Sequence, residues 1–142
     1  MDKKKDLADK LRSSGLRPTK QRIMLAEYLF IRDKTFHFTV ENLDKAINKK
    51  NLVDKIALAT IYNTVHAFKK AGHLKEILIK DGKNYFDTNT SAHHHFYDEQ
   101  NNELIDIDNN KIELKKFPAP PKGKSIKNLN VIINIDNDNQ NH

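Results

Sequence analysis

The sequence gathers its histidines at one point, where they could bind a metal ion or haem. Three of the seven histidines are consecutive, His93, His94 and His95, and they follow Asp87 closely. Imidazole is a suitable ligand for iron, zinc, copper and nickel, and a nearby carboxylate shifts the preference toward harder first-row ions. We therefore expect a metal or haem site in this segment.

Composition limits what else the chain can be. It has 142 residues and no cysteine, which excludes disulfides, thiolate catalysis, iron-sulfur clusters and cysteine-bound zinc. No segment approaches the roughly twenty apolar residues of a membrane span, and the first residues resemble no targeting sequence. We expect a cytoplasmic protein that does not contact a membrane and holds any metal through nitrogen and oxygen.

The positive charge lies in the first part of the chain. Residues 1–86 hold nineteen Lys and Arg against ten Asp and Glu, whereas residues 87–142 hold six against nine. A basic half is a candidate for binding a polyanion. Lysine and asparagine are abundant throughout, as an AT-rich genome would also produce, so charge alone does not establish nucleic-acid binding.

Apolar periodicity predicts four helices, over residues 2–13, 18–31, 39–47 and 57–71. Pro18 is expected at the first position of the second helix and Thr39 as the N-cap of the third. Two β-prone runs, 74–80 and 83–88, then flank Asp81-Gly82 and predict a hairpin. Helices followed by a hairpin indicate a winged helix-turn-helix domain, which binds DNA.

The last of these helices has two different faces. Its apolar face carries Leu58, Ile61, Val65 and Phe68. The opposite face carries hydrogen-bonding, aromatic and cationic groups, namely Thr60, Tyr62, Asn63, His66, Lys69 and Lys70. Such a face is usually only a solvated surface, but within a winged helix it is the one that reads base edges.

The second part of the chain predicts a small sheet. Strands are expected at 93–97 and 104–107, a short helix at 111–117, and an alternating last strand at 128–135. So small a core would be marginal alone, so we expect it to pair with a second copy. The fold class is α+β: a winged-helix domain over 1–88, a small dimerisation and metal- or haem-sensing domain over 89–135, and a disordered tail over 136–142.

Four segments form a recognisable set: Gly15-Leu16-Arg17-Pro18-Thr19-Lys20-Gln21-Arg22, His37-Phe38-Thr39, Leu58-Ala59-Thr60-Ile61-Tyr62-Asn63-Thr64-Val65, and the histidine triplet with Leu104-Ile105-Asp106. Together they resemble the ferric uptake regulator family of bacterial metal-responsive repressors. The triplet, Tyr85-Phe86-Asp87-Thr88-Asn89 and the lack of cysteine look most like the iron response regulator branch.

The resemblance implies a homodimeric repressor of iron homeostasis that binds double-stranded operator DNA of inverted-repeat type. By position, Thr60, Tyr62 and Asn63 would contact base edges, and Arg17 would reach the minor groove or the backbone. Lys20 and Arg22 would contact phosphates.

The resemblance also implies a metal site. Its ligands would be His37, Asp87, His93, His95 and Asp106, and Fe²⁺, Mn²⁺ or Zn²⁺ would suit them. On a strand, His93 and His95 point to the same face and His94 to the other. The iron response regulator branch further implies haem binding by His93, His94 and His95.

Three alternatives remain open. A manganese- or peroxide-sensing member of the same family would be compatible with the same ligands. A zinc metallohydrolase could use three histidines with carboxylates, but the sequence lacks a helical His-Glu-x-x-His motif and an evident general base. A metal- or haem-buffering protein would not need a helix face of the kind found in 58–65.

Overall fold

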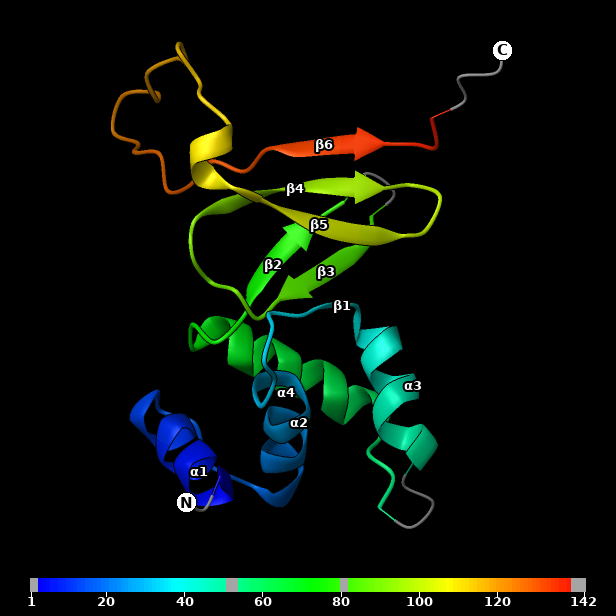
Figure 1. The fold of residues 1–142 in the computed structure, drawn as a ribbon. Coiled ribbons are helices and arrows are strands. Elements are labelled where there is room, and N and C mark those ends of the chain that lie inside the picture. Colours follow the sequence, from blue (N-terminus) through cyan, green and yellow to red (C-terminus); the bar gives the residue numbers. More distant parts are fainter. Residues whose placement is uncertain (1–2, 51–53, 80–81, 139–142) are drawn as a thin grey trace. The chain divides into compact units, whose positions relative to one another are not determined.

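The computed structural model describes residues 3–50, 54–79 and 82–138. The chain divides into two compact units, an N-terminal unit of residues 1–90 and a C-terminal unit of residues 91–142 (Figure 1). Each unit contains one three-stranded sheet, and all the α-helices of the described residues belong to the N-terminal unit. None of these helices combines the length and the apolar character needed to cross a membrane.

The four predicted helices are present. They are α1 (Lys3–Ser13), α2 (Lys20–Phe30), α3 (Val40–Lys50) and α4 (Leu58–Lys70). Thr39 caps α3 as expected, because its hydroxyl oxygen accepts a hydrogen bond from the Asn42 N–H at 3.1 Å.

The start of α2 differs from the prediction. Thr19 is the N-cap of this helix, and its hydroxyl accepts from the Arg22 N–H at 3.2 Å, so Pro18 precedes the cap and is not the first helical residue. A threonine can satisfy a free N–H of the first turn, which a proline cannot, and this side-chain bond places the helix start.

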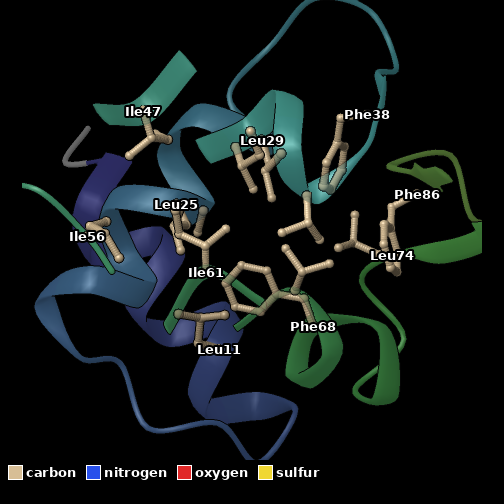
Figure 2. Close-up of a cluster of buried hydrophobic side chains, with 14 of the residues drawn as sticks. Leu11, Leu25, Leu29, Phe38, Ile47, Ile56, Ile61, Phe68, Leu74 and Phe86 are labelled. Atoms are coloured by element: carbon tan, nitrogen blue, oxygen red, sulfur yellow. The ribbon is translucent and has the colours of Figure 1, made fainter. Parts of the chain in front are cut away.

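The core of the N-terminal unit lies between the four helices and the first strands (Figure 2). Helix α4 contributes Ile61, Val65 and Phe68, all fully buried, as its apolar spacing predicts. Leu58 was expected on the same face but is 50 % exposed. It is the first residue of the helix, whereas Thr64, nearly two turns further along, is buried beside this stripe.

The predicted hairpin is formed by β2 (Lys75–Leu78) and β3 (Asn84–Asp87). The Ile79 N–H donates to the Lys83 carbonyl at 3.0 Å, and Gly82 has a φ of +73°, which a glycine adopts without steric cost. Asp81 lies outside the described residues. A further strand, β1 (His37–Phe38), pairs with the other edge of β3, so the sheet order is β1-β3-β2 with all pairs antiparallel.

The C-terminal unit is a sheet of β4 (His93–Asp98), β5 (Glu103–Asp108) and β6 (Ile132–Ile135) in the order β5-β4-β6. Strands β4 and β5 are antiparallel, and β6 runs parallel to β4. The last strand is shorter than predicted, because it begins at Ile132 instead of 128.

The prediction of a short helix over residues 111–117 is wrong. Only a 3₁₀ turn, η1 (Asn109–Lys111), follows β5, and residues 112–131 form neither helix nor strand. Leu114 and Phe117 are 43 % and 58 % exposed, so this segment has no packed face to stabilise a short helix, and the prolines from 118 onward prevent its extension. Of the predicted disordered tail, residues 136–138 are exposed and irregular, and 139–142 lie outside the described residues.

Candidate functional site

Two of the five expected metal ligands face one another within the N-terminal unit. His37 in β1 and Asp87 at the end of β3 are direct cross-strand partners, and the His37 Nε2 atom lies 3.1 Å from the Asp87 Oδ2 atom. The Asp87 side chain is fully buried, and its Oδ1 atom accepts a hydrogen bond from the Asn89 N–H at 2.8 Å. We call His37 and Asp87 the N-terminal pair.

The other three expected ligands come together within the C-terminal unit. His93 and His95 lie on one face of β4, and Asp106 is the β5 partner of His95. The Nε2 atoms of both histidines lie 3.2 Å from the same Asp106 Oδ1 atom, and the two rings are 4.4 Å apart between centroids. Both histidines are buried, whereas the Asp106 side chain is 33 % exposed. We call these residues the C-terminal trio.

The hydrogen bonding of His93 suits a ligand. Its Nδ1 atom lies 2.7 Å from the Ser91 carbonyl oxygen, which can only accept, so Nδ1 carries the proton. In the neutral ring the lone pair is then on Nε2, the atom directed at Asp106. Metal-binding histidines commonly have their second nitrogen fixed by such a carbonyl.

His94 belongs to the opposite face of β4, as the two-residue period of a strand predicts. Its Nδ1 atom accepts a hydrogen bond from the Val131 N–H at 3.0 Å, and the side chain is buried. This bond joins β4 to the residue that precedes β6. The triplet therefore divides into two histidines on the face of Asp106 and one that ties the sheet together.

The donor atoms fit a divalent first-row cation. The C-terminal trio offers two imidazole nitrogens and one carboxylate oxygen, and these three atoms lie within 4.8 Å of one another. The N-terminal pair offers one nitrogen and one oxygen. Imidazole and carboxylate together are typical of Fe²⁺, Mn²⁺ and Zn²⁺ sites, and the lack of cysteine removes the softer thiolate alternatives.

Most of the expected DNA-binding residues gather at a hollow of about 430 Å³ on the N-terminal unit. Its walls come from the start of α2, the residues before it, and one face of α4. The lining residues are Arg17, Thr19, Gln21, Arg22, Thr60, Asn63 and Thr64. Arg17, Arg22, Thr60 and Asn63 were expected to bind DNA, whereas Thr19, Gln21 and Thr64 line the hollow without having been expected there. Thr19 and Gln21 stand directly beside Lys20 and Arg22 in the sequence.

The remaining two expected DNA-binding residues lie outside this hollow. Tyr62 is exposed on α4, and its ring is 4.8 Å from the His66 ring between centroids. Lys20 is exposed, and its Nζ atom lies 3.8 Å from Asp54 Oδ2. Two of the residues that line the hollow are joined directly, because the Arg22 Nη1 atom donates to the Arg17 carbonyl at 3.0 Å.

The sequence matches the Ferric uptake regulator family over residues 13–133. Among similar proteins, the peroxide operon regulator of Bacillus subtilis is 31 % identical over 103 residues, covering 72 % of this chain and 68 % of that protein. The peroxide-responsive repressor PerR of Staphylococcus aureus strain Mu50 is 36 % identical over 97 residues, covering 68 % of this chain and 63 % of that protein. These relatives do not confirm the iron response regulator branch.

Solved structures support the fold. The ferric uptake regulator of Vibrio cholerae has a TM-score of 0.69 at 20 % identity, covering 92 % of this chain and 98 % of that chain. That of Pseudomonas aeruginosa with manganese has a TM-score of 0.67 at 23 % identity, covering 91 % and 96 %. The α+β fold is therefore confirmed, and the named relatives are regulators and not hydrolases. The chain belongs to the ferric uptake regulator family of metal-responsive transcription regulators, and it is not an enzyme.

Proposed function

We propose that this protein is a homodimeric repressor whose binding to inverted-repeat operator DNA depends on a divalent metal ion held by the N-terminal pair and the C-terminal trio together. The observation that carries this proposal is the convergence of His93 Nε2 and His95 Nε2 on one Asp106 oxygen at 3.2 Å each. A trio of this kind leaves room in a coordination sphere for the nitrogen and oxygen of the N-terminal pair.

The metal would act by tying the two units together. When bound, it supplies a positive charge that attracts imidazole and carboxylate ligands from both units at once. His37 and Asp87 are fixed to the DNA-binding unit by the β1–β3 pairing, and His93, His95 and Asp106 to the other unit by the β4–β5 pairing. Shared coordination would select one relative orientation of the units, and in a dimer this sets the spacing of the two α4 helices.

DNA binding would use α4 and the hollow beside it. Thr60, Tyr62 and Asn63 would read base edges in the major groove, while Arg17 would reach the minor groove or the backbone. Lys20 and Arg22 would bind phosphates, which adds affinity without sequence preference. The position of Arg17, Arg22, Thr60 and Asn63 around one hollow supports a common DNA-binding surface for these four residues.

The dimer would form through the C-terminal unit. On the face of its sheet opposite the C-terminal trio, Ile105, Phe96 and Ile133 lie side by side across the three strands. Ile105 and Ile133 are 44 % and 39 % exposed, which leaves an apolar face open in the single chain. Such a face is typical of a contact between subunits.

The test is the DNA affinity of the metal-free protein before and after addition of Mn²⁺, Fe²⁺ or Zn²⁺, at one salt concentration because phosphate contacts make affinity salt-dependent. We expect one or more of these ions to strengthen operator binding by a coupling factor in the usual range of about 5- to 150-fold. The variant His95→Ala should bind DNA as weakly with metal as without it. If metal strengthened the DNA binding of His95→Ala as much as that of the wild-type protein, the proposed metal site would be contradicted.

Peroxide sensing is the form of regulation that the named relatives favour, since several are peroxide regulators. With iron bound, hydrogen peroxide would add one oxygen atom to the ring of a ligating histidine and leave its other oxygen as water. Mass spectrometry of peroxide-treated protein should find the mass of one oxygen added at His37, His93 or His95. If His66 and His73 were oxidised as much as these three histidines, peroxide sensing at the metal site would be contradicted.

Haem sensing is a second form, favoured by the three consecutive histidines. Because His94 faces away from His93 and His95, at most two of the three could approach one haem iron from the same side of the sheet. Titration of haem should give a saturable Soret shift that is lost in His93→Ala but kept in His94→Ala. No saturable shift would refute haem binding.

A further inference from the structure

A row of aromatic rings runs from the N-terminal pair to the DNA-reading face of α4. It begins at Phe38, stacks on Phe86 at 5.7 Å between centroids, and continues to His66, which meets Phe86 edge to face at 5.9 Å. It ends at Tyr62, 4.8 Å from His66. We call Phe38, Phe86, His66 and Tyr62 the aromatic row.

The first two rings are locked to the metal ligands by the backbone. Phe38 directly follows His37, and Phe86 directly precedes Asp87. The strand register pairs His37 with Asp87 and Phe38 with Phe86, so the distance between the two ligands and the distance between the two rings are set by the same two residue pairs. Both rings are almost completely buried and belong to the core (Figure 2).

The strand that carries His37 is short. β1 has two residues, and its pairing with β3 continues beyond the strand, where the Phe36 N–H donates to the Thr88 hydroxyl at 2.8 Å and the Thr88 N–H donates to the Phe36 carbonyl at 3.0 Å. A cation bound by His37 and Asp87 would fasten β1 to β3 directly. Such a fastening favours the arrangement in which Phe38 stacks on Phe86.

The last two rings of the row, His66 and Tyr62, connect the stacked pair Phe38 and Phe86 to the proposed DNA-reading face of α4. Tyr62 and His66 are four residues apart on α4 and therefore neighbours on one helix face. Tyr62 is 43 % exposed, whereas His66 is partly buried, and its ring contacts both Tyr62 and Phe86. The His66 ring therefore packs against the Tyr62 ring.

We propose that His66 is a positioning residue that couples occupancy of the N-terminal pair to the orientation of Tyr62 through the aromatic row. This coupling rests on the proposed function, in which Tyr62 reads a base edge, but it acts inside the N-terminal unit. It is therefore additional to the effect of metal on the orientation of the two units. This coupling requires a flat ring at position 66, but it does not require the nitrogen atoms of the histidine ring.

The test compares His66→Leu with His66→Phe in the full chain. Both replacements are apolar, but only phenylalanine retains a ring that can contact Phe86 and Tyr62. Operator affinity is measured with and without Mn²⁺ at fixed salt. We expect His66→Phe to keep the metal-dependent gain in operator affinity of the wild-type protein. In His66→Leu this gain should be smaller by a factor of at least about 5, the lower end of usual coupling factors. Because coupling is reciprocal, operator DNA should also raise Mn²⁺ affinity less in His66→Leu.

A second readout does not involve DNA. Zn²⁺, which is diamagnetic, is added to the protein with labelled tyrosines, and the Tyr62 ring signals are identified with Tyr62→Phe. Zinc should shift these signals in the wild-type and His66→Phe proteins and leave them nearly unchanged in His66→Leu. Lys70→Ala, a change to an exposed residue of the same helix, is the control and should retain the zinc-induced shift.

The outcomes separate the two proposals. If His66→Leu retains the full metal-dependent gain and the full Tyr62 shift, the aromatic row carries no coupling, while the proposed function stands. If the wild-type protein shows no metal-dependent change in DNA affinity, the proposed function fails and the coupling fails with it. A His66→Phe protein that behaves like His66→Leu overturns the requirement for a ring.

Discussion

His37 and Asp87 are fifty residues apart in sequence and direct partners across two strands, with 3.1 Å between Nε2 and Oδ2. Asp87 is fully buried, and a buried carboxylate is costly unless it is paired or binds a cation. The N-terminal unit therefore keeps an acidic group in its interior next to an imidazole. This is an arrangement more easily explained by ligand binding than by stability.

Replacing Asp87 with asparagine tests that explanation. Asp87→Asn keeps the shape of the side chain and an oxygen that can accept from Asn89, but it removes the buried charge. We expect metal affinity to fall by more than about 10-fold, while the metal-free protein unfolds at the same or a higher temperature. Metal competition against a chelator and thermal unfolding give the two values. A less stable metal-free variant would mean that the carboxylate serves the fold.

The neighbours His93 and His94 should differ sharply despite their adjacency. His93→Ala removes a proposed ligand nitrogen and should lower Mn²⁺ affinity by more than about 100-fold, beyond the loss usual for a residue that only supports a ligand. His94→Ala leaves the Val131 N–H without its acceptor and should instead destabilise the protein by about 1 to 3 kcal/mol. Calorimetric Mn²⁺ titration and denaturant unfolding measure these effects. Equal loss of Mn²⁺ affinity in both variants would contradict the division of the triplet.

DNA contacts are tested by a pair of exposed side chains. Tyr62→Ala should cost about 1 to 3 kcal/mol on the operator and little on random DNA, because Tyr62 is expected to read a base. Lys20→Ala should weaken binding to both and reduce the slope of log affinity against log salt by about one. Gel-shift titrations at several salt concentrations give both quantities.

The carboxylate beside Lys20 provides a control for that pair. Asp54 Oδ2 lies 3.8 Å from the Lys20 Nζ, so it would compete with a phosphate that binds the same cation. Asp54→Asn should leave specificity unchanged and raise affinity for both operator and random DNA slightly. Equal losses on random DNA for Tyr62→Ala and Lys20→Ala would overturn the assignment of roles.

Much of this architecture could be predicted from local sequence signals. The four helices and the β2–β3 hairpin follow from apolar spacing, caps and Gly82, and the opposite facing of His93 and His94 follows from the period of a strand. Each of these signals lies within a few residues. The expected metal ligands depended on resemblance, because no local rule brings His37 next to Asp87.

The errors fall where context outweighs a local signal. β1 was missed because two residues show no periodicity, and it exists only through its pairing with β3. The helix over 111–117 was expected from composition, but nothing packs on Leu114 or Phe117 to stabilise it. Gln21 lines the hollow together with residues of α4, a placement that no local signal in the sequence predicts.

His73 should make stability depend on pH. Burial, and secondarily the charge of Lys10, lowers its pKa below the ordinary value of 6.5. Its Nε2 atom also lies 2.7 Å from the Ser14 hydroxyl. The unfolded chain then binds a proton more readily than the folded one, so the free energy of unfolding should decrease as pH falls through about 6.5 and level off below the folded pKa.

The measurement is urea unfolding of metal-free protein across about pH 5 to 8, the range in which histidine changes charge. His73→Gln keeps a hydrogen-bonding group near Ser14 but does not titrate. The variant should lose part of the pH dependence shown by the wild-type protein. Identical pH profiles for the two proteins would show that His73 does not contribute.

The open apolar face of the C-terminal sheet should control the oligomeric state. Ile105 and Ile133 flank Phe96, and a carboxylate placed among them would be buried without a partner in any dimer that uses this face. Ile105→Glu and Ile133→Glu should each shift the protein toward monomer in analytical ultracentrifugation. Operator affinity should fall as the dimer is lost, because each half-site would then be bound by a separate monomer.

Leu78→Glu is the matched control for these variants. Leu78 is 69 % exposed, also lies on a strand, and belongs to the N-terminal unit. The same substitution there should leave the oligomeric state unchanged. If all three variants remain dimers at concentrations where the wild-type protein is a dimer, the subunits meet through another surface, and the exposed Leu114, Phe117, Ile126 and Leu129 of residues 112–131 become the next positions to test.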